Sequence, residues 1–527
     1  MLPRRFCILP LLAAAACPAQ ITTSQVDNSR TGANLHETIL TPRNVNPKEF
    51  GKLFTVPVDG DVYAQPLFVP GVEIPGRGRH DVLYIATEHD TVYAFDAYTP
   101  GAPLWQVSLL REGEMPVAEE DVQCFFIRPD VGITSTPVID LKTGTLYVLA
   151  RTKNRHYLSS NEFHQRLHAL AITNGVEKLG GPVEIHASVP GRGDGSNNGQ
   201  VAFNPLRENP RAALLLANNA VYLSWASSCD VGPYHGWIMA YDANTLKQRA
   251  VLNVSPDADD SGIWASDTGI AADSSGFVYA ATGNGRFDVS KGGRDYGDTL
   301  LKLNGNDLSI ADYFTPYDAA QLNADDSDLG SGGPMLLPDQ PHAPSHLGLI
   351  GGKAPTLYLV NRDRMGHYQP GSDSHAAQTI PTKGGIYGSA AYWNHTVYVL
   401  ADSDSLRAYG VANGRLSYKG STTFTLRDHA ATPAVSANGN KDGIVWVVSS
   451  KSWNGAPRPA VLHAVDASDV TRDLYSSERN PARDRAGIGM RFNIPTIANG
   501  HVYIGGRHEV DVYGELGASQ QAEGAGH

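Results

Sequence analysis

Cysteine is scarce in this sequence, with only four in 527 residues. Two lie close to the N-terminus, and Cys124 and Cys229 lie in the body of the chain. Neither belongs to a CxxC or CxxH spacing, so we predict no thiolate zinc site and assign no metal-ligating residue. We expect Cys124 and Cys229 to form one disulfide between neighbouring structural units. The other interpretation is a pair of buried thiols.

An excess of basic residues is also absent. The chain has 42 Lys and Arg against 54 Asp and Glu, which gives a formal net charge of -12. Because non-specific binding to nucleic acid needs a basic face, we expect no nucleic-acid partner. Charged residues make up only 18% and hydrophobic residues 41% of the chain. This composition argues against a disordered chain and allows a sizeable core.

Long hydrophobic runs are missing beyond the first twenty residues, so no transmembrane segment is predicted. At the N-terminus, two arginines precede a short apolar stretch at 6–16, and small residues follow. This pattern is typical of a cleaved export signal, which we place at residues 1–19. Lipidation of Cys17 is the alternative, although the leucine expected three residues before such a cysteine is missing. We therefore expect an exported protein, periplasmic or extracellular.

Strand-forming and turn-forming residues are abundant, with 54 Gly, 33 Pro and 23 Tyr. Apolar–aromatic–apolar segments recur at 83–85, 146–148, 221–223, 278–280, 397–399, 445–447 and 502–504. A second alternating segment follows most of them, as at 91–96, 237–242 and 462–466. A third segment often precedes them and has a proline at its start, where a strand loses no ladder donor. The repeating unit is thus a group of three or four antiparallel strands.

A looser unit, with strands near 335 and 357–360, brings the count to eight. Units of this kind are typical of a β-propeller or a β-solenoid, because one unit cannot bury both of its faces alone. We predict an all-β fold, an eight-bladed β-propeller of four-stranded antiparallel blades, with seven blades as the alternative. A lone strand at 52–58 would complete the last blade and remove an exposed edge.

The predicted organisation is therefore a signal peptide at 1–19, an N-terminal extension at 20–49 and one propeller domain at 50–514. Residues 515–527 are small and polar, and we expect them to be disordered. We expect the protein to be a monomer.

These units resemble the pyrroloquinoline-quinone (PQQ) repeat, in which a small–Pro–apolar strand precedes an apolar–Tyr–apolar strand and a strand that ends Ala–aromatic–Asp. Residues 64–96 match this pattern well, and the resemblance covers roughly residues 50–514. The stretches 129–137, 234–237, 281–285 and 328–334 are similar to those of exported bacterial proteins that carry this repeat. The resemblance implies a propeller like that of the quinoprotein alcohol dehydrogenases. It does not imply one activity, because assembly proteins and enzymes share the repeat.

In the dehydrogenases of this family, the resemblance implies PQQ near the propeller axis, with a calcium ion that polarises a quinone carbonyl and a carboxylate that acts as base. Such a site needs a tryptophan platform, a carboxylate and an amide for calcium, and a basic residue near the quinone. The alcohol dehydrogenases also carry two adjacent cysteines, which this chain lacks. It has no CxxCH motif, so the subtype with a fused cytochrome is excluded.

Residues at or just before the starts of the inner strands are expected to face the axial funnel. The candidates for cofactor or ligand binding are Gln65, Thr136, Trp264, Ser266, Tyr387, His429, Arg491 and Asn493. Trp264 is suited to stack on a planar ligand, and Arg491 to pair with a carboxylate. Asp267 is the candidate catalytic base or cation ligand. For each residue the other interpretation is a satisfied polar side chain that closes the channel.

Two functions of different classes follow from the sequence. The first is an exported module that binds a small molecule, a glycan or a protein. The absence of an adjacent cysteine pair and of a haem motif favours it. The second is a soluble dehydrogenase that uses PQQ and Ca²⁺ to oxidise alcohols or sugars, which Trp264, Asp267 and Arg491 support. The cofactor, if there is one, is left open.

Overall fold

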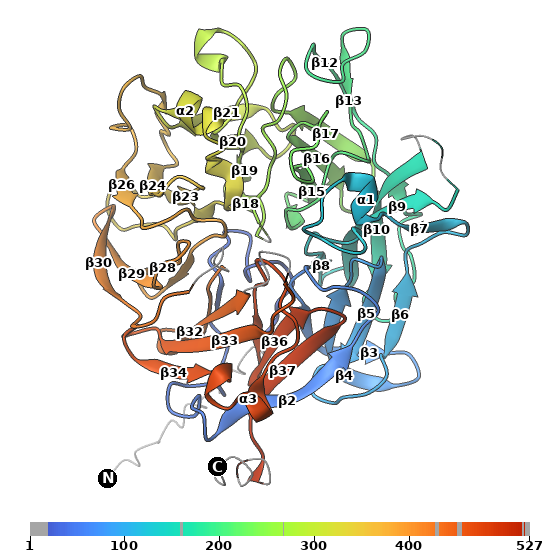
Figure 1. Ribbon diagram of the computed structural model, residues 1–527, viewed down its shortest axis with the longest axis vertical. Coiled ribbons are helices and arrows are strands. Elements are labelled where there is room, and N and C mark those ends of the chain that lie inside the picture. The colour runs from blue at the N-terminus through green and yellow to red at the C-terminus, as the bar shows by residue number, and fades with distance from the viewer. Residues whose placement is uncertain are drawn as a thin grey trace, which may run out of the picture.

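The structure of the protein, a computed structural model, describes residues 19–156, 158, 162–266, 268–426, 432–450, 456–518 and 521. It is a ring of eight antiparallel sheets around a central axis (Figure 1). The prediction of an eight-bladed β-propeller with four-stranded blades is confirmed, and seven blades is wrong. Three predicted features lie wholly or mostly outside the described residues: the signal peptide at 1–19, of which only Ala19 is described, the lipidation site Cys17, and the tail at 515–527.

The blades follow one another in chain order around the ring. Blade 1 contains β3 (Leu67–Ile74), β4 (Gly78–Ala86), β5 (Thr91–Asp96) and β6 (Trp105–Ser108). Blade 2 contains β8 (Val138–Asp140), β9 (Thr145–Asn154), β10 (Phe163–Ala171) and β11 (Val183–Glu184), with β7 (Glu114–Pro116) paired to β9. Blade 3 contains β14 (Leu215–Ala217), β15 (Ala220–Trp225), β16 (Trp237–Asp242) and β17 (Gln248–Asn253). Blade 4 contains β18 (Ala271–Ala272), β19 (Phe277–Ala281), β20 (Leu300–Asn304) and β21 (Ile310–Thr315), and β25 (His367–Tyr368) pairs with its edge.

The second half of the ring has the same plan. Blade 5 contains β22 (Met335–Leu336), β23 (Leu347–Gly351), β24 (Thr356–Asn361) and β26 (Gln378–Pro381). Blade 6 contains β27 (Ala391–Trp393), β28 (Thr396–Val399), β29 (Arg407–Ala412) and β30 (Arg415–Ser421). Blade 7 contains β31 (Ala434–Asn438), β32 (Lys441–Ser450), β33 (Ala460–Asp466) and β34 (Asp473–Ser476). Blade 8 contains β35 (Thr496–Ala498), β36 (His501–Gly506), β37 (Glu509–Glu515) and, on its outer edge, β2 (Phe50–Pro57).

Few elements lie outside the blades. A hairpin of β12 (Ser188–Pro190) and β13 (Gln200–Ala202) projects from the loop between blades 2 and 3. Within the described residues the α-helices are short: α1 (Glu119–Val122), α2 (Ala319–Ala324) and α3 (Pro481–Asp484). None of the helices in this part of the chain is both long enough and apolar enough to cross a membrane.

The repeated tyrosine has a structural role that explains its spacing. In five blades it lies at the centre of the second strand, where its ring is buried and its hydroxyl donates to a backbone carbonyl of the next blade. The bonds are Tyr84 to Ile172 (2.9 Å), Tyr147 to Ala243 (2.5 Å), Tyr222 to Gly305 (2.7 Å), Tyr398 to Ala467 (2.6 Å) and Tyr503 to Ala97 (3.2 Å). A buried hydroxyl needs such a partner, so the repeat both fills the core and joins neighbouring blades.

Strand β2 closes the ring. It comes from near the N-terminus and pairs antiparallel with β37, close to the C-terminal end of the propeller. This pairing covers the outer edge of β37, which would otherwise present unpaired backbone groups to solvent. Blade 8 is therefore built from both ends of the chain.

A second N-terminal segment closes one end of the central channel. We call residues 21–34 the N-terminal belt; they include β1 (Ala33–Asn34), which pairs in parallel with β31. In chain order the belt bonds to the first strand of every blade: Ile21 to Phe68, Thr22 to Ile139, Asn28 to Leu216 and Ala272, Ser29 to Leu336, Thr31 to Tyr392, Gly32 to Val435 and Asn34 to Ile497. Arg30 is fully buried within it and donates to the carbonyls of Ser24, Leu214 and Ile270.

Candidate functional site

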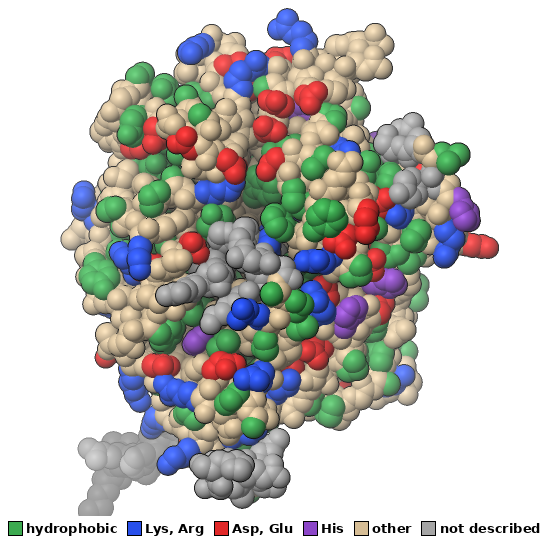
Figure 2. Space-filling model, viewed as in Figure 1, with side chains coloured by type: hydrophobic (Ala, Val, Ile, Leu, Met, Phe, Trp, Pro, Cys, Tyr) green, Lys and Arg blue, Asp and Glu red, His purple; other side chains and the backbone are tan. Residues whose placement is uncertain are grey.

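A cavity of about 520 Å³ lies on the propeller axis, among loops that precede the first strands of the blades. The belt bonds to these same strands further along their length, so the belt and the cavity occupy opposite ends of the channel. Ligand pockets typically have volumes of roughly 300–1,000 Å³ and lie where loops from several elements meet. On this face of the molecule acidic side chains lie above the central hollow, and several Lys and Arg side chains lie at its lower rim (Figure 2).

One side of the cavity is formed by two arginines that rest on aromatic rings. The guanidinium of Arg491, from the loop before β35, lies 3.9 Å from the ring centroid of Phe126. That of Arg211, from the loop before β14, lies 4.9 Å from the ring centroid of Phe492. Burial lowers the pKa of Arg491 to about 10, and the nearby charge of Arg211 acts in the same direction. Arg491 therefore remains a cation at neutral pH.

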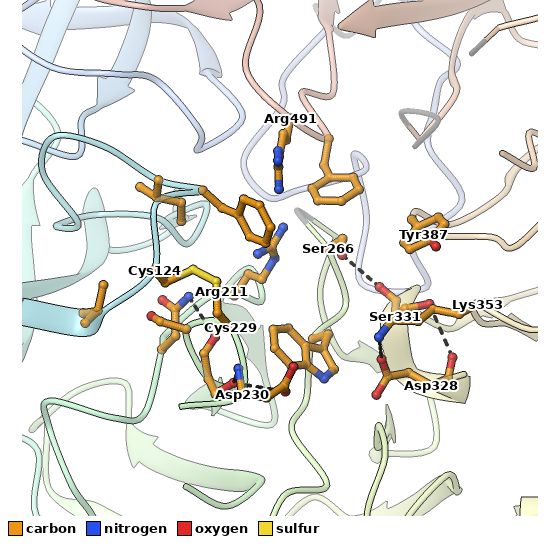
Figure 3. A pocket seen from close by; sticks show the side chains of 18 of the residues that line it. Cys124, Arg211, Cys229, Asp230, Ser266, Asp328, Ser331, Lys353, Tyr387 and Arg491 are labelled. Carbon is orange, nitrogen blue, oxygen red and sulfur yellow. Dashed lines mark hydrogen bonds and ion pairs between the residues drawn. A yellow bond between two sulfur atoms is a disulfide. The ribbon is translucent and has the colours of Figure 1, made fainter. Parts of the chain in front are cut away.

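The disulfide between Cys124 and Cys229 lines the same side of the cavity (Figure 3). Cys124 follows α1 in blade 2, and Cys229 lies between β15 and β16 in blade 3, so the bond joins neighbouring blades. Cys229 and Asp230 both adopt left-handed backbone conformations, with φ of 54° at each. The Asp230 carboxylate accepts hydrogen bonds from the hydroxyls of Tyr234 (2.8 Å) and Ser227 (3.4 Å). The disulfide and these bonds hold an otherwise unfavourable turn at the cavity wall.

An acidic group lies across the cavity and surrounds Lys353. The Lys353 ammonium is 2.6 Å from an Asp326 oxygen and 2.5 Å from an Asp328 oxygen. Asn284 donates its side-chain amide to Asp326 and its backbone N–H to Asp328. Burial alone would lower the pKa of Lys353, but Asp328 and Asp326 raise it on balance, so the ammonium stays charged.

Behind this group, Asp298 is fully buried and accepts a hydrogen bond from the backbone N–H of Leu329 (2.9 Å). Burial raises the pKa of Asp298 to about 8, and the charge of Asp328 adds to the shift. Asp298 is therefore largely protonated at neutral pH, unlike an ordinary surface carboxyl.

Trp264 packs against the acidic side. A Cβ at Gly283 would lie 2.4 Å from Asp328 Oδ1 and 2.7 Å from Trp264 Nε1, so only glycine fits between them. Trp264 Nε1 is buried and, among the described residues, has no hydrogen-bond partner. The indole therefore lines the cavity beside a carboxylate while its N–H remains unpaired.

The candidate ligand-binding residues predicted from the sequence fall into two groups in the structure, those that line the cavity and those that do not. Trp264, Ser266, Tyr387 and Arg491 line the cavity together. The other three that are described, Gln65, Thr136 and Asn493, are buried away from it and join the inner ends of the blades. Gln65 bonds to Gln25, Thr136 and Thr496, and the Asn493 amide donates to Val62 and Gly505. Asp267 and His429 lie outside the described residues.

Several cavity residues escaped the sequence analysis. Arg211, Asp230 and Lys353 lie in irregular loops with no motif around them. Asp328 begins the stretch 328–334, but the resemblance of that stretch assigned it no role. Phe126 lies two residues after Cys124, so an expectation that the disulfide lies near the axis would have pointed to it. The signal for Arg211 is weaker, since it only shares with Arg491 a position a few residues before a first strand.

The cavity matches part of what PQQ would require. Its volume, the Trp264 indole and the two arginines suit a flat molecule with several carboxylates. For calcium, however, no group of three or more His, Cys, Asp or Glu side chains in the described ranges is arranged to hold a metal ion. Asp326 and Asp328, two of the carboxylates that line the cavity, are already bonded to Lys353. The described residues therefore do not fit the cofactor together with its metal, and we derive no reaction step through either.

Comparison with solved structures places the fold in a known class. The chain superposes on quinohemoprotein alcohol dehydrogenase from Comamonas testosteroni with a TM-score of 0.61 at 14% identity, covering 95% of this chain and 81% of that one. A europium-containing methanol dehydrogenase gives 0.57 at 14% identity, with 94% and 98% covered. BamB from Moraxella catarrhalis gives 0.50 at 11% identity, with 88% and 99% covered. The fold is that of the quinoprotein-type propellers.

No protein-family model matches the sequence, and no curated protein matches it either. At identities of 11–14% the structural likeness defines the fold alone. The dehydrogenases and BamB share this architecture, so the activity of the chain has to be argued from its own cavity.

Proposed function

We propose that this chain is an exported binding module that holds a small organic ligand in its axial cavity. The observation that carries the proposal is the composition of the cavity wall. Arg211 and Arg491 lie across the cavity from Lys353, and the indole of Trp264 also lines it. Charged groups on both sides of an aromatic-lined cavity fix the orientation of a ligand, and the apolar faces supply binding energy.

The belt supports this proposal. It bonds to all eight blades at the far end of the channel from the cavity, so we expect ligand to enter and leave from the loop side. A rigid ring with one open end suits selective retention of a ligand, because the lining residues are held in place before binding.

Export is supported by two independent features. The N-terminal sequence is typical of a cleaved signal, and the Cys124–Cys229 disulfide is of the kind that forms and persists in oxidising compartments. Mass spectrometry of the protein secreted by its host would check this part, with Gln20 expected as the first residue.

The binding proposal is tested by screening the mature protein against a library of metabolites, with thermal shift and tryptophan fluorescence as readouts. Hits should bind the wild type and the surface variant Arg415→Gln equally, and lose affinity in Arg211→Gln. Roughly tenfold loss is expected for one charged hydrogen bond. If all hits bind Arg211→Gln as tightly as the wild type, the axial cavity is not the binding site.

A PQQ-dependent dehydrogenase is the second candidate, and Trp264 together with the two arginines in one cavity is the observation that favours it. It is tested by titrating the protein with PQQ in the presence and absence of Ca²⁺ and measuring dye-linked oxidation of alcohols and sugars. Binding at micromolar PQQ that is lost in Trp264→Ala would favour the dehydrogenase. Absence of binding at that concentration would eliminate it.

A further inference from the structure

A second cavity, of about 1100 Å³, lies at the outer rim of the ring between blades 4 and 5. We call it the rim cleft; its lining comes from residues 311–312 at the start of β21, and from 343–344 and 361–377 in the loops that follow β22 and β24. Neighbouring strands of blade 5 are antiparallel, so these loops leave the blade at the end opposite to Ser331 and Lys353, which line the axial cavity. The rim cleft is therefore separate from the axial site.

The lining of the rim cleft is polar and has no large apolar side chain. Among the described lining residues the apolar ones are alanines and Pro344, without Leu, Ile, Val, Met or Phe. A hydrophobic anchor residue of a partner protein would have no apolar pocket to fill there. The chain also carries a formal net charge of -12, which opposes the approach of a polyanion. These features favour a neutral ligand that is rich in polar groups.

A flat aromatic surface borders the rim cleft. The imidazole of His367 stacks on the ring of Tyr313, with centroids 4.5 Å apart and planes inclined by 10°. The His367 side chain is 62% exposed, which leaves the ring face that is turned away from Tyr313 open to a ligand. An Asp312 carboxylate oxygen lies 3.2 Å from His367 Nε2 and holds the ring in place. The face of an aromatic ring is weakly negative, so it attracts the weakly positive C–H groups of a sugar ring.

The backbone of His367 is held in an unfavourable conformation. Its φ is 61°, in the left-handed region that residues other than glycine rarely adopt. The parallel pairing of β25 with β21, which joins His367 to Phe314, holds this segment against the edge of blade 4. Residues that the surrounding structure keeps in such conformations are concentrated at functional sites. The strain is therefore a second reason to assign a role to this ring.

Three planar polar groups in the lining are not used within the described part of the chain. The guanidinium of Arg364 is exposed and makes no hydrogen bond or ion pair to a described residue. The side-chain NH₂ groups of Asn361 and Gln369 likewise donate to no described residue. Amides and guanidiniums present several donors in one plane, so each can bond two neighbouring hydroxyls of one sugar ring.

We propose that the rim cleft binds a neutral oligosaccharide, with one sugar ring stacked on His367 and its hydroxyls bonded to Arg364, Asn361 and Gln369. This is a second site at the other end of the blades, and it does not depend on the function proposed for the axial cavity. The ligand has several sugar rings, because the volume of the cleft lies above the roughly 300–1,000 Å³ that is typical of pockets for single small molecules.

Isothermal titration calorimetry with a panel of hexasaccharides tests the proposal on the mature protein. The neutral probes are cellohexaose, maltohexaose, xylohexaose and hexa-N-acetylchitohexaose, each compared with its own monosaccharide, and hexagalacturonate is the polyanionic probe. At least one neutral hexasaccharide should bind roughly tenfold more tightly than its monosaccharide, because one further hydrogen bond to a charged group contributes about that factor. If none binds at millimolar concentration, or if hexagalacturonate binds more tightly than every neutral probe, the proposal is wrong.

Two variants assign the binding to the rim cleft. His367→Asn removes the flat ring but keeps a residue type that tolerates a left-handed backbone, and Arg364→Ala removes the unused guanidinium. Each should weaken the bound hexasaccharide by roughly tenfold. The matched controls are His36→Asn and Arg43→Ala, both exposed in the N-terminal segment that packs on blades 7 and 8, and both should bind as the wild type does. Because Arg364 is exposed, its variant keeps the test decisive even if His367→Asn does not fold.

The outcomes also separate the rim cleft from the axial cavity. Saccharide binding that is lost in either cleft variant and retained in Arg211→Gln supports the proposal, even if the axial cavity binds no library compound. Binding that is lost in Arg211→Gln and retained in both cleft variants would place the sugar in the axial cavity and overturn the proposal. Unchanged affinity in all three variants would overturn it as well.

Discussion

Removal of the Cys124–Cys229 disulfide should destabilise the protein by an amount set by the length of the loop that it closes. The two cysteines are 105 residues apart in the sequence. In the chain-entropy model a loop of that length restricts the unfolded state by about 5 kcal/mol at 25 °C. Dividing this free energy by the unfolding entropy expected for a chain of this size gives a decrease in melting temperature of roughly 5 °C.

The assay is differential scanning calorimetry of the double variant Cys124→Ala/Cys229→Ala, compared with the wild type with and without a reductant. Both the variant and the reduced wild type should melt about 5 °C lower than the oxidised wild type. Hydrogen exchange should rise first in the loops around the two cysteines, which form one side of the axial cavity. Equal melting temperatures for the oxidised wild type and the double variant would refute the loop-entropy reasoning for this bond.

Two further predictions concern buried polar groups. Arg30→Met removes a side chain that donates to three backbone carbonyls, so it should lower the free energy of unfolding by at least about 3 kcal/mol, measured by urea denaturation. A midpoint equal to that of the exposed variant Arg415→Met would contradict the role given to the belt. Asp298 has a pKa raised to about 8 in the folded state, so the native protein retains a proton that the unfolded chain releases. Stability should therefore fall as the pH rises from about 4 to about 8, and Asp298→Asn should flatten this dependence; an unchanged slope would be inconsistent with the burial argument.

The repeat made the fold predictable, and the reason is physical. An aromatic residue between two apolar ones marks a strand whose two faces are both covered, and eight such units need a closed ring to cover them. What the pattern does not reveal is that Tyr84 and its counterparts donate a hydrogen bond to the next blade. For Tyr84 that partner is a backbone carbonyl 88 residues away, and for Tyr503 it is 406 residues away. A partner of this kind carries no signature in the sequence.

The candidate site was only partly predictable for a related reason. Trp264 and Arg491 precede inner strands, so their position relative to the repeat places them near the axis. Gln65 has the same kind of position, but its amide is used between the belt and blade 8. Lys353 and Arg211 face the cavity through loops whose course depends on contacts between blades, and local sequence does not encode those contacts.

The belt also has a consequence for the order of events during synthesis. Residues 21–34 are made before any of the blades, yet their last partner, Ile497, belongs to the eighth blade and is made after the other seven. The belt therefore cannot complete its bonds until every blade is present, although chains usually fold from the N-terminus onward. An unfinished ring leaves a loose N-terminal strand within reach of proteases, whereas the finished ring withdraws it. Protection of the belt from proteolysis therefore indicates that the last blade has folded.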